Sequence, residues 1–156
     1  MAELISKQVA AMAAGTTGVG KAINGFSFPK TRKIKIHAPT TQVNAQNDTM
    51  GSGIPLPIGT RFGLGSIVSH AAQGASVTLD IGIRDFKTKV AIAAAGIGSA
   101  LAVAASGRTA ANNGTLLIDG ADSVTTQVSE VYFTYTGANP TDNAQMCVEV
   151  EVHLPD

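Results

Sequence analysis

The sequence predicts an all-β fold: a two-sheet β-sandwich with an extended or partly helical N-terminal arm. Apolar and polar residues alternate over short segments, most regularly over residues 75–82 and 146–154, as in strands that bury one face. Glycine, proline and other turn-forming residues separate these segments. Residues 1–37 carry six basic side chains and one acidic one (net +5), whereas residues 38–156 carry five basic and ten acidic ones (net −5). Such a division indicates a basic arm that reaches toward an acidic surface.

The 156 residues are enough for one domain, which would bury roughly two-thirds of the surface of its unfolded chain. We expect an arm over residues 1–30 and a sandwich domain over residues 31–156. Charged residues make up only 14% of the chain, against roughly 25% in an average soluble protein, and the net charge is zero. Weak charge repulsion favours association, so we expect contacts with other copies of the chain or with other partners.

The arm opens with a short helical stripe, because Ile5, Val9 and Met12 recur at the spacing of one helix face. Four glycines from residue 15 to residue 25 interrupt the helix, and Pro29 keeps the following chain extended. One short stripe is too little to fold alone, so we expect the arm to leave its own sandwich and bind a partner. The residues expected to make this contact are Ile5, Lys7, Val9, Met12, Lys21 and Lys30.

Six to eight strands are expected in the sandwich domain. The first covers residues 32–37, where Ile34 and Ile36 share one face. A polar loop over residues 39–53 and a turn over residues 54–59 follow it. Further strands are expected over residues 61–70, 75–82, 114–119, 124–136 and 146–154.

The phases of these strands predict how they pack. The polar positions of the first strand hold Lys33 and Lys35, and those of the last strand hold two glutamates. We therefore expect residues 32–37 to pair with residues 146–154 in one sheet. The side chains expected to point between the sheets are Val77, Leu79, Ile81, Val131, Phe133, Val148, Val150 and Val152.

No catalytic, cofactor or metal site is predicted. Residues 15–21 (GTTGVGK) match the phosphate-binding pattern G-x-x-x-x-G-K, but Ala22 replaces the hydroxyl residue that binds magnesium, and no strand is expected before the segment. Glu149 and Glu151 share one strand face, which we interpret as a charged outer surface rather than a pair of catalytic carboxylates. We assign no chemical role to the single cysteine, to the three histidines, or to Asp80, Asp85, Asp119 and Asp122.

Nucleic acid and membrane are not expected as partners. Aromatic residues are 4% of the chain and tryptophan is absent, whereas modules that bind single strands need stacking aromatics and positive charge. The apolar residues 90–105 would form a helix of about 24 Å, shorter than the roughly 30 Å hydrocarbon core of a bilayer. We interpret this segment as a packed segment or as loop and strand. The N-terminus lacks the pattern of a secretory signal, so a soluble protein is expected.

From about residue 31 to residue 154, the order of segments resembles small virion proteins of tailed bacteriophages, namely capsid decoration, cement and head proteins. The resemblance lies in an L-P-x-G-T-R turn (LPIGTR, residues 56–61), in an S-V-T-L-D-I-G strand (residues 76–82), and in a closing strand of alternating valine and glutamate. Residues 84–89 depart from the pattern, because an Asp-rich polar loop is expected there and RDFKTK stands in its place.

The resemblance implies that the two-sheet β-sandwich is jelly-roll-like. It also implies a non-enzymatic structural protein without cofactors, which coats the outer surface of a capsid after synthesis in the cytoplasm of a bacterial host. Its implied partners are the major capsid protein and other copies of itself, as a dimer or trimer. One alternative is a neck, tail or fibre-base component of the virion. Another is a host-facing carbohydrate-binding sandwich, although the scarcity of aromatic residues speaks against sugar stacking.

Overall fold

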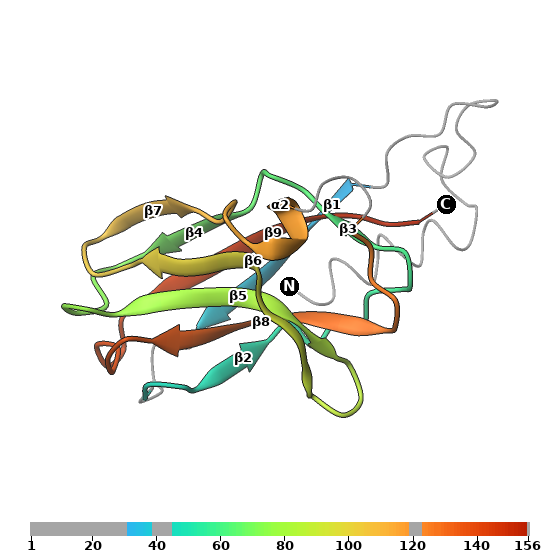
Figure 1. Cartoon of the computed structure of the whole chain (residues 1–156). Coiled ribbons are helices and arrows are strands. Elements are labelled where there is room, and N and C mark those ends of the chain that lie inside the picture. Colours follow the sequence, from blue (N-terminus) through green and yellow to red (C-terminus); the bar gives the residue numbers. More distant parts are fainter. Residues whose placement is uncertain (1–30, 39–44, 119–122, 156) are drawn as a thin grey trace, which may run out of the picture.

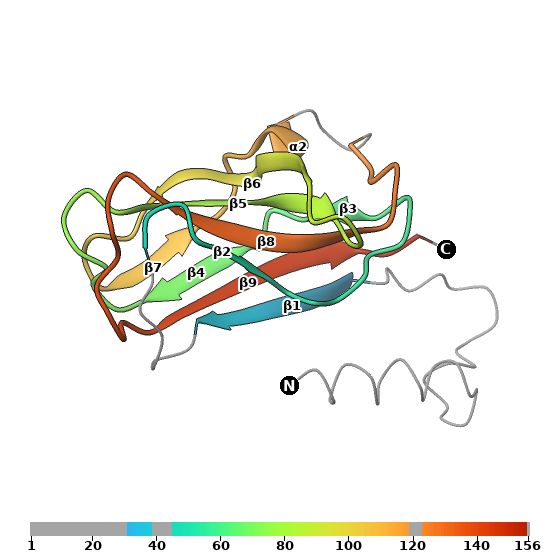
Figure 2. The ribbon, with the colours of Figure 1, turned by 90° about the horizontal axis from the view of Figure 1, so that it is seen from below.

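The computed structural model describes residues 31–38, 45–118 and 123–155. In this part of the chain, nine strands form two antiparallel sheets that lie face to face as a sandwich (Figures 1 and 2). The strands are β1 (Thr31–Ala38), β2 (Thr49–Gly51), β3 (Arg61–Phe62), β4 (Ile67–His70), β5 (Thr78–Asp85), β6 (Ala91–Ala102), β7 (Gly107–Ala110), β8 (Ser129–Thr136) and β9 (Met146–His153), and one helical turn, α2 (Thr115–Ile118), precedes β8.

The strand order is that of a jelly roll, which confirms the predicted fold class. One sheet has the order β1-β9-β4-β7, with the short β3 also pairing with β9, and the other has the order β2-β8-β5-β6. The antiparallel pairs are nested along the chain, because β1 pairs with β9, β2 with β8, β4 with β7, and β5 with β6. A chain folded in this way forms two interlocked Greek keys, the arrangement that defines the jelly roll.

The core lies between the two sheets and contains the side chains that the strand phases predict. Each of the eight is at most 2% exposed, and they are Val77, Leu79, Ile81, Val131, Phe133, Val148, Val150 and Val152. Phe133 and Tyr135 add an edge-to-face aromatic pair, with ring centroids 5.4 Å apart and planes at 84°. The alternation of apolar and polar residues therefore specified the inward face of each of these strands.

The predicted pairing of the first and last strands is also confirmed. β1 pairs with β9 over its whole length, and Lys35 lies opposite Glu149 in the register. The Lys35 Nζ is 2.6 Å from the Glu149 Oε1, and the Lys33 Nζ is 3.8 Å from the Glu149 Oε2. Opposite charges on the outer face thus support the register that the apolar positions require on the inner face.

Residues 61–70 do not form one strand, contrary to the prediction. They form β3 and β4, separated by a turn in which Gly63 and Gly65 lie against the Glu151 side chain. A Cβ atom at either glycine would overlap that carboxylate, so the Glu151 side chain can lie in this position because both residues are glycines.

Residues 114–119 were expected to include a strand, and this is wrong for the described residues. Residues 115–118 form α2, because the Leu117 N–H donates to the Gly114 carbonyl and closes a helical turn. Leu116 then packs on Gly96 of β6. The apolar run is partly buried from a helix rather than from a sheet.

Residues 90–105 form a strand and a loop, as expected, and they are buried only in part, since Val90 and Ile92 are exposed. β6 bulges strongly, since Ile81 of β5 faces Gly98 whereas Ile83 faces Ala93. The chain between these points passes over Gly82, where a Cβ would overlap the Ala93 carbonyl oxygen. None of the helices in the described residues is long and apolar enough to cross a membrane.

The sandwich has two ends, which are named here by their position relative to β1. The proximal end, where β1 begins, contains the connections over residues 52–66, 86–90 and 111–128. The distal end contains the connections over residues 71–77 and 137–145, together with the β6–β7 turn. Residues 1–30 lie outside the described part of the chain and join the sandwich at its proximal end.

Leu79→Ala is expected to lower the free energy of unfolding by about 2–5 kcal/mol, because it removes burial and leaves a cavity between the sheets. Leu64→Ala is the matched control, since Leu64 is 69% exposed, and a change within about 0.5 kcal/mol is expected. Urea unfolding measures both values. A loss below about 1 kcal/mol for Leu79→Ala would show that the core is wrongly assigned.

Candidate interaction surfaces

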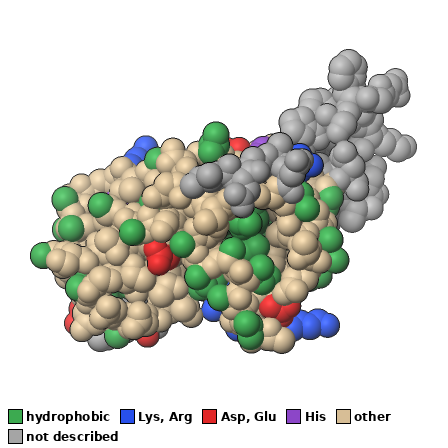
Figure 3. Space-filling model, viewed as in Figure 1, with side chains coloured by type: hydrophobic (Ala, Val, Ile, Leu, Met, Phe, Trp, Pro, Cys, Tyr) green, Lys and Arg blue, Asp and Glu red, His purple; other side chains and the backbone are tan. Residues whose placement is uncertain are grey.

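Exposed apolar side chains concentrate at the proximal end of the sandwich. In the described residues, the large hydrophobic side chains with substantial exposure lie in proximal connections, except for one at the start of β6. They are Ile58, Leu64, Val90, Ile92 (in β6), Val124 and Val128. Figure 3 shows hydrophobic side chains gathered to the right of the centre, on the half of the face that carries the β5–β6 hairpin. Such segregated apolar surface marks an interaction site more often than scattered exposure does.

Backbone hydrogen bonds connect three proximal segments that carry these exposed side chains. The Gly59 N–H donates to the Thr125 carbonyl at 2.7 Å, which places Ile58 near Val124. The Phe86 N–H donates to the Val128 carbonyl at 3.2 Å, and the Asp85 N–H donates to the Val90 carbonyl at 2.8 Å. The exposed valines of the hairpin and of the segment before β8 therefore flank the same two residues. We call the surface formed by Ile58, Val90, Ile92, Val124 and Val128 the apolar end.

A buried carboxylate holds these segments in place. Glu130 of β8 is fully buried, and its Oε1 lies 2.7 Å from the Arg84 Nε and 2.8 Å from the Lys89 Nζ. Its Oε2 accepts a hydrogen bond from the Gly53 N–H at 3.0 Å. The side chain thus connects β8 to the β5–β6 hairpin and to the segment that follows β2.

Two opposing effects act on the Glu130 carboxyl. Burial disfavours its charge and would raise the pKa, but the hydrogen bonds from Lys89 and Arg84 outweigh burial, so the pKa lies below its ordinary value. The Arg84 guanidinium also lies 5.1 Å from the centroid of the Tyr132 ring. Glu130 is therefore ionised at neutral pH and is part of the structural support of the proximal end.

The outer face of the β1-β9-β4-β7 sheet is polar. Lys35 and Glu149 form its central ion pair, in which the hydrogen bond raises the pKa of the lysine and lowers that of the glutamate. Glu151 lies 3.2 Å from the His153 ring. Both glutamates are engaged by basic groups of the same face, which supports their interpretation as a charged outer surface.

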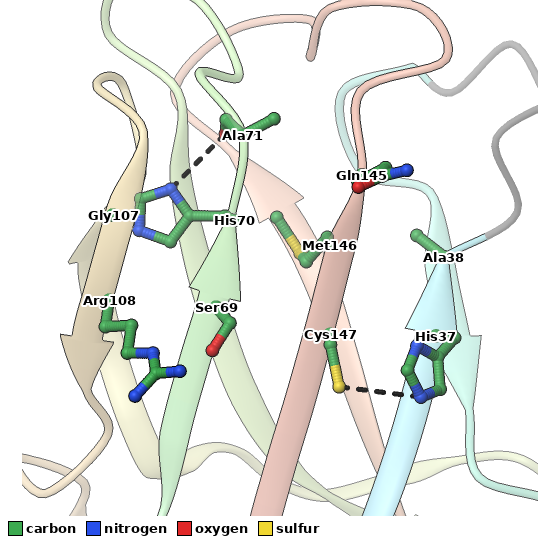
Figure 4. A pocket seen from close by; sticks show the side chains of 10 residues that line it. All are labelled: His37, Ala38, Ser69, His70, Ala71, Gly107, Arg108, Gln145, Met146 and Cys147. Carbon is green, nitrogen blue, oxygen red and sulfur yellow. Dashed lines mark hydrogen bonds between the residues drawn. The ribbon is translucent and has the colours of Figure 1, made fainter.

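A cleft of about 630 Å³ lies at the distal side of this face, around a row of side chains from four neighbouring strands (Figure 4). The row consists of His37, Cys147, Ser69 and Arg108. The Cys147 Sγ lies 3.6 Å from the His37 Nε2, as in a cysteine–histidine pair. Burial and then the negative charge of Glu149 raise the pKa of the thiol, so the thiolate needed for nucleophilic attack is scarce at neutral pH.

Other candidate ligands are occupied or isolated. No group of three or more histidine, cysteine, aspartate or glutamate side chains that could hold a metal ion occurs in the part of the chain that the structure describes. Asp85 accepts hydrogen bonds from the Thr88 N–H at 2.6 Å and from the Lys87 N–H at 2.9 Å, so its carboxylate shapes the hairpin turn. Asp80 accepts one from the Ala100 N–H. Asp119 and Asp122 lie outside the described residues.

The residues predicted to bind a partner also lie outside the described residues, and their role stays a prediction. They are Ile5, Lys7, Val9, Met12, Lys21 and Lys30. Sequence reasoning missed the apolar end and Glu130. The sequence does carry a signal for the exposure of Val90 and Ile92, because these residues directly follow the charge-rich segment RDFKTK at residues 84–89. Glu130 occupies an ordinary polar position of its strand, and its burial has no local signature.

Glu130→Gln is expected to lower the free energy of unfolding at pH 7 by about 3 kcal/mol, because Arg84 and Lys89 lose their charged acceptor. The pKa of Glu130 in the folded chain lies below its ordinary value of 4.5. Its contribution is therefore present above about pH 4.5 and is lost as the pH falls through the lower folded value. The difference between the two proteins should shrink in acid.

Urea unfolding at several pH values measures this difference. Asp142→Asn is the matched control, since Asp142 is exposed in the distal connection over residues 137–145, and a change within about 0.5 kcal/mol is expected. An equal loss for both variants, or a loss for Glu130→Gln that does not change with pH, would contradict the assigned role of the buried carboxylate.

The Cys147 thiol is expected to react with iodoacetamide at pH 7 more slowly than the same thiol in the urea-unfolded chain, because its raised pKa reduces the thiolate fraction. Mass spectrometry over time gives both rates. A folded-state rate equal to or above the unfolded one would indicate an activated cysteine and would reopen a catalytic role for the cleft.

Comparisons with known proteins give two structural likenesses. The chain is similar to a chain of the cyanophage Pam1 capsid asymmetric unit, with a TM-score of 0.48 and 19% identity over 86% of this chain and 92% of that one. It is also similar to a chain of the acidic stable capsid structure of Helicobacter pylori bacteriophage KHP30, with a TM-score of 0.44 and 16% identity over 81% and 89%. No family model and no curated protein matches the sequence.

Proposed function

We propose that this protein is a non-enzymatic structural component of a phage particle, a capsid decoration or cement protein that binds the major capsid protein and stabilises the shell from its outer surface. The observation that carries the proposal is the apolar end, a surface suited to contacts between the proteins of a coat, which lies at the end of the sandwich where β1 begins and where residues 1–30 are attached. The jelly roll adds support as an analogy only, since viral capsid domains, lectins and cupins all use it.

The two motifs of the phage resemblance have structural roles that fit this proposal. In the L-P-x-G-T-R turn, Leu56 is buried and the Thr60 hydroxyl donates to the Pro57 carbonyl at 2.7 Å, whereas Ile58 projects outward with 59% exposure. The turn thus presents an apolar side chain at the proximal end. The S-V-T-L-D-I-G segment forms most of β5, which pairs with both β6 and β8 in its sheet.

The arm supplies the second contact of the proposed protein. Ile5, Val9 and Met12 offer an apolar stripe, and Lys7, Lys21 and Lys30 offer positive charge toward an acidic surface. We propose that this segment binds a neighbouring subunit or the capsid shell. Burial of the stripe would contribute the greater part of the free energy, because attraction between exposed charges is screened by salt.

The alternative functions have less support from the described surfaces. Both tyrosines are buried, Tyr132 at 4% and Tyr135 at 1% exposure, and the chain has no tryptophan, so sugar-stacking platforms of these types are lacking. A neck, tail or fibre-base location differs from decoration in stoichiometry. Quantitative mass spectrometry of purified particles gives the copy number: one that follows the capsid lattice supports decoration, and one confined to a single vertex supports the neck or tail.

Deletion of residues 1–25 is expected to leave the melting temperature of the sandwich nearly unchanged and to weaken binding to particles that lack the protein. Co-sedimentation with such particles measures the binding, and added salt should weaken binding of the full chain. Lys33→Ala is a suitable control, because it removes a positive charge from the sandwich outside the arm. A truncated chain that fails to fold, or that binds particles as well as the full chain, would contradict the proposed role of the arm.

A further inference from the structure

We propose that the apolar end is the surface on which a second copy of this chain packs, with the N-terminal segment of one copy lying across the apolar end of the next. The inference rests on the proposed function, because a coat of this protein needs contacts between its copies. It adds the location of that contact and the residues that make it.

The uneven distribution of apolar surface is the first argument. All the large exposed hydrophobic side chains of the described residues lie toward the proximal end, although nothing in a sandwich requires the two ends to differ. The distal connection over residues 137–145 carries the exposed Asp142 and no large exposed hydrophobic side chain. An apolar area confined to one end and bordered by Lys87 and Lys89 is typical of a contact with another protein.

The apolar end is also held in a fixed shape. Ion pairs of Glu130 with Arg84 and Lys89 connect β8 to the β5–β6 hairpin. Backbone hydrogen bonds connect the hairpin to the segment before β8. Val90 and Val128 therefore project from ordered backbone. A surface that is already ordered loses little conformational entropy when a partner binds.

The N-terminal segment is the reason for choosing a second copy as the occupant. β1 begins at the proximal end, where Thr31 lies opposite His153 of β9. Eighteen residues separate Met12 from Thr31, and a random-coil chain of that length has an average span of about 23 Å. This span exceeds the distance of about 10 Å between the two sheets of a sandwich. The stripe of one copy can therefore reach the proximal end of a neighbour that abuts it.

Interface size links the stripe to the apolar end. A stable interface buries roughly 800 Å² on each partner. Five partly exposed side chains provide only part of that area, and the stripe of Ile5, Val9 and Met12 adds to it on each copy. In a closed symmetric oligomer, every copy both donates a stripe and receives one, so no apolar end stays uncovered.

The test places a charge on the apolar end. Val90→Glu and Val128→Glu are compared with Ala105→Glu, which adds the same charge at an exposed position in the distal β6–β7 turn. Sedimentation equilibrium at several concentrations measures self-association, and circular dichroism monitors folding. We expect an oligomeric full chain, at least about tenfold weaker self-association for each valine variant, and no change for the control. Deletion of residues 1–25 should also weaken self-association.

A monomeric full chain, or valine variants that associate like the control, would overturn the inference. So would a truncated chain that associates as strongly as the full one. If glutamate prevents folding, the near-isosteric Val90→Thr and Val124→Thr are measured instead, and unchanged association overturns the inference in the same way. Particle binding, measured separately, distinguishes the two proposals: a monomer that decorates particles contradicts only this inference, and an oligomer that never binds them contradicts only the proposed function.

Discussion

Strand β9 holds the larger sheet together, because it pairs with β1, β3 and β4 and so joins three distant parts of the chain. The sheet can close only after the C-terminal segment has come between β1 and β4, which makes its formation a long-range event with a loop-closure cost. The same pairing sets Thr31 beside His153. The chain therefore enters and leaves the sandwich at the proximal end, the same end of the sandwich that carries the exposed apolar side chains.

The apolar end depends on a charge cluster beneath it. An isolated carboxylate in the position of Glu130 would be strongly disfavoured by burial, and it is tolerated because Arg84, Lys89 and the Gly53 N–H satisfy both of its oxygens. These contacts fix the hairpin and the neighbouring segments, whose apolar side chains then face outward. Buried polar contacts thus support an exposed apolar surface, whereas apolar side chains are usually buried and polar ones exposed. Such exposure is typical of an interaction site.

Much of the fold could be predicted because strands with one buried face carry a period of two. That period identified β1, β5, β8 and β9 and their inward residues, and the charges at the remaining positions identified the pairing of β1 with β9. The predictions over residues 61–70 and 114–119 were wrong because contacts from outside those segments decide them. Glu151 occupies the space beside Gly63 and Gly65, and β6 provides the surface on which α2 rests.

The sequence by itself determined which residues face the core, since alternation within a strand is a local property that every strand carries in its own order of residues. Only the tertiary structure decided which connections meet at one end, because that depends on the nesting of strands far apart in the chain. Ile58, Val90 and Val128 look like unrelated apolar residues along the sequence. Their segments meet at one end of the sandwich because β8 and β5 bring them together and because the buried Glu130 holds the hairpin in place.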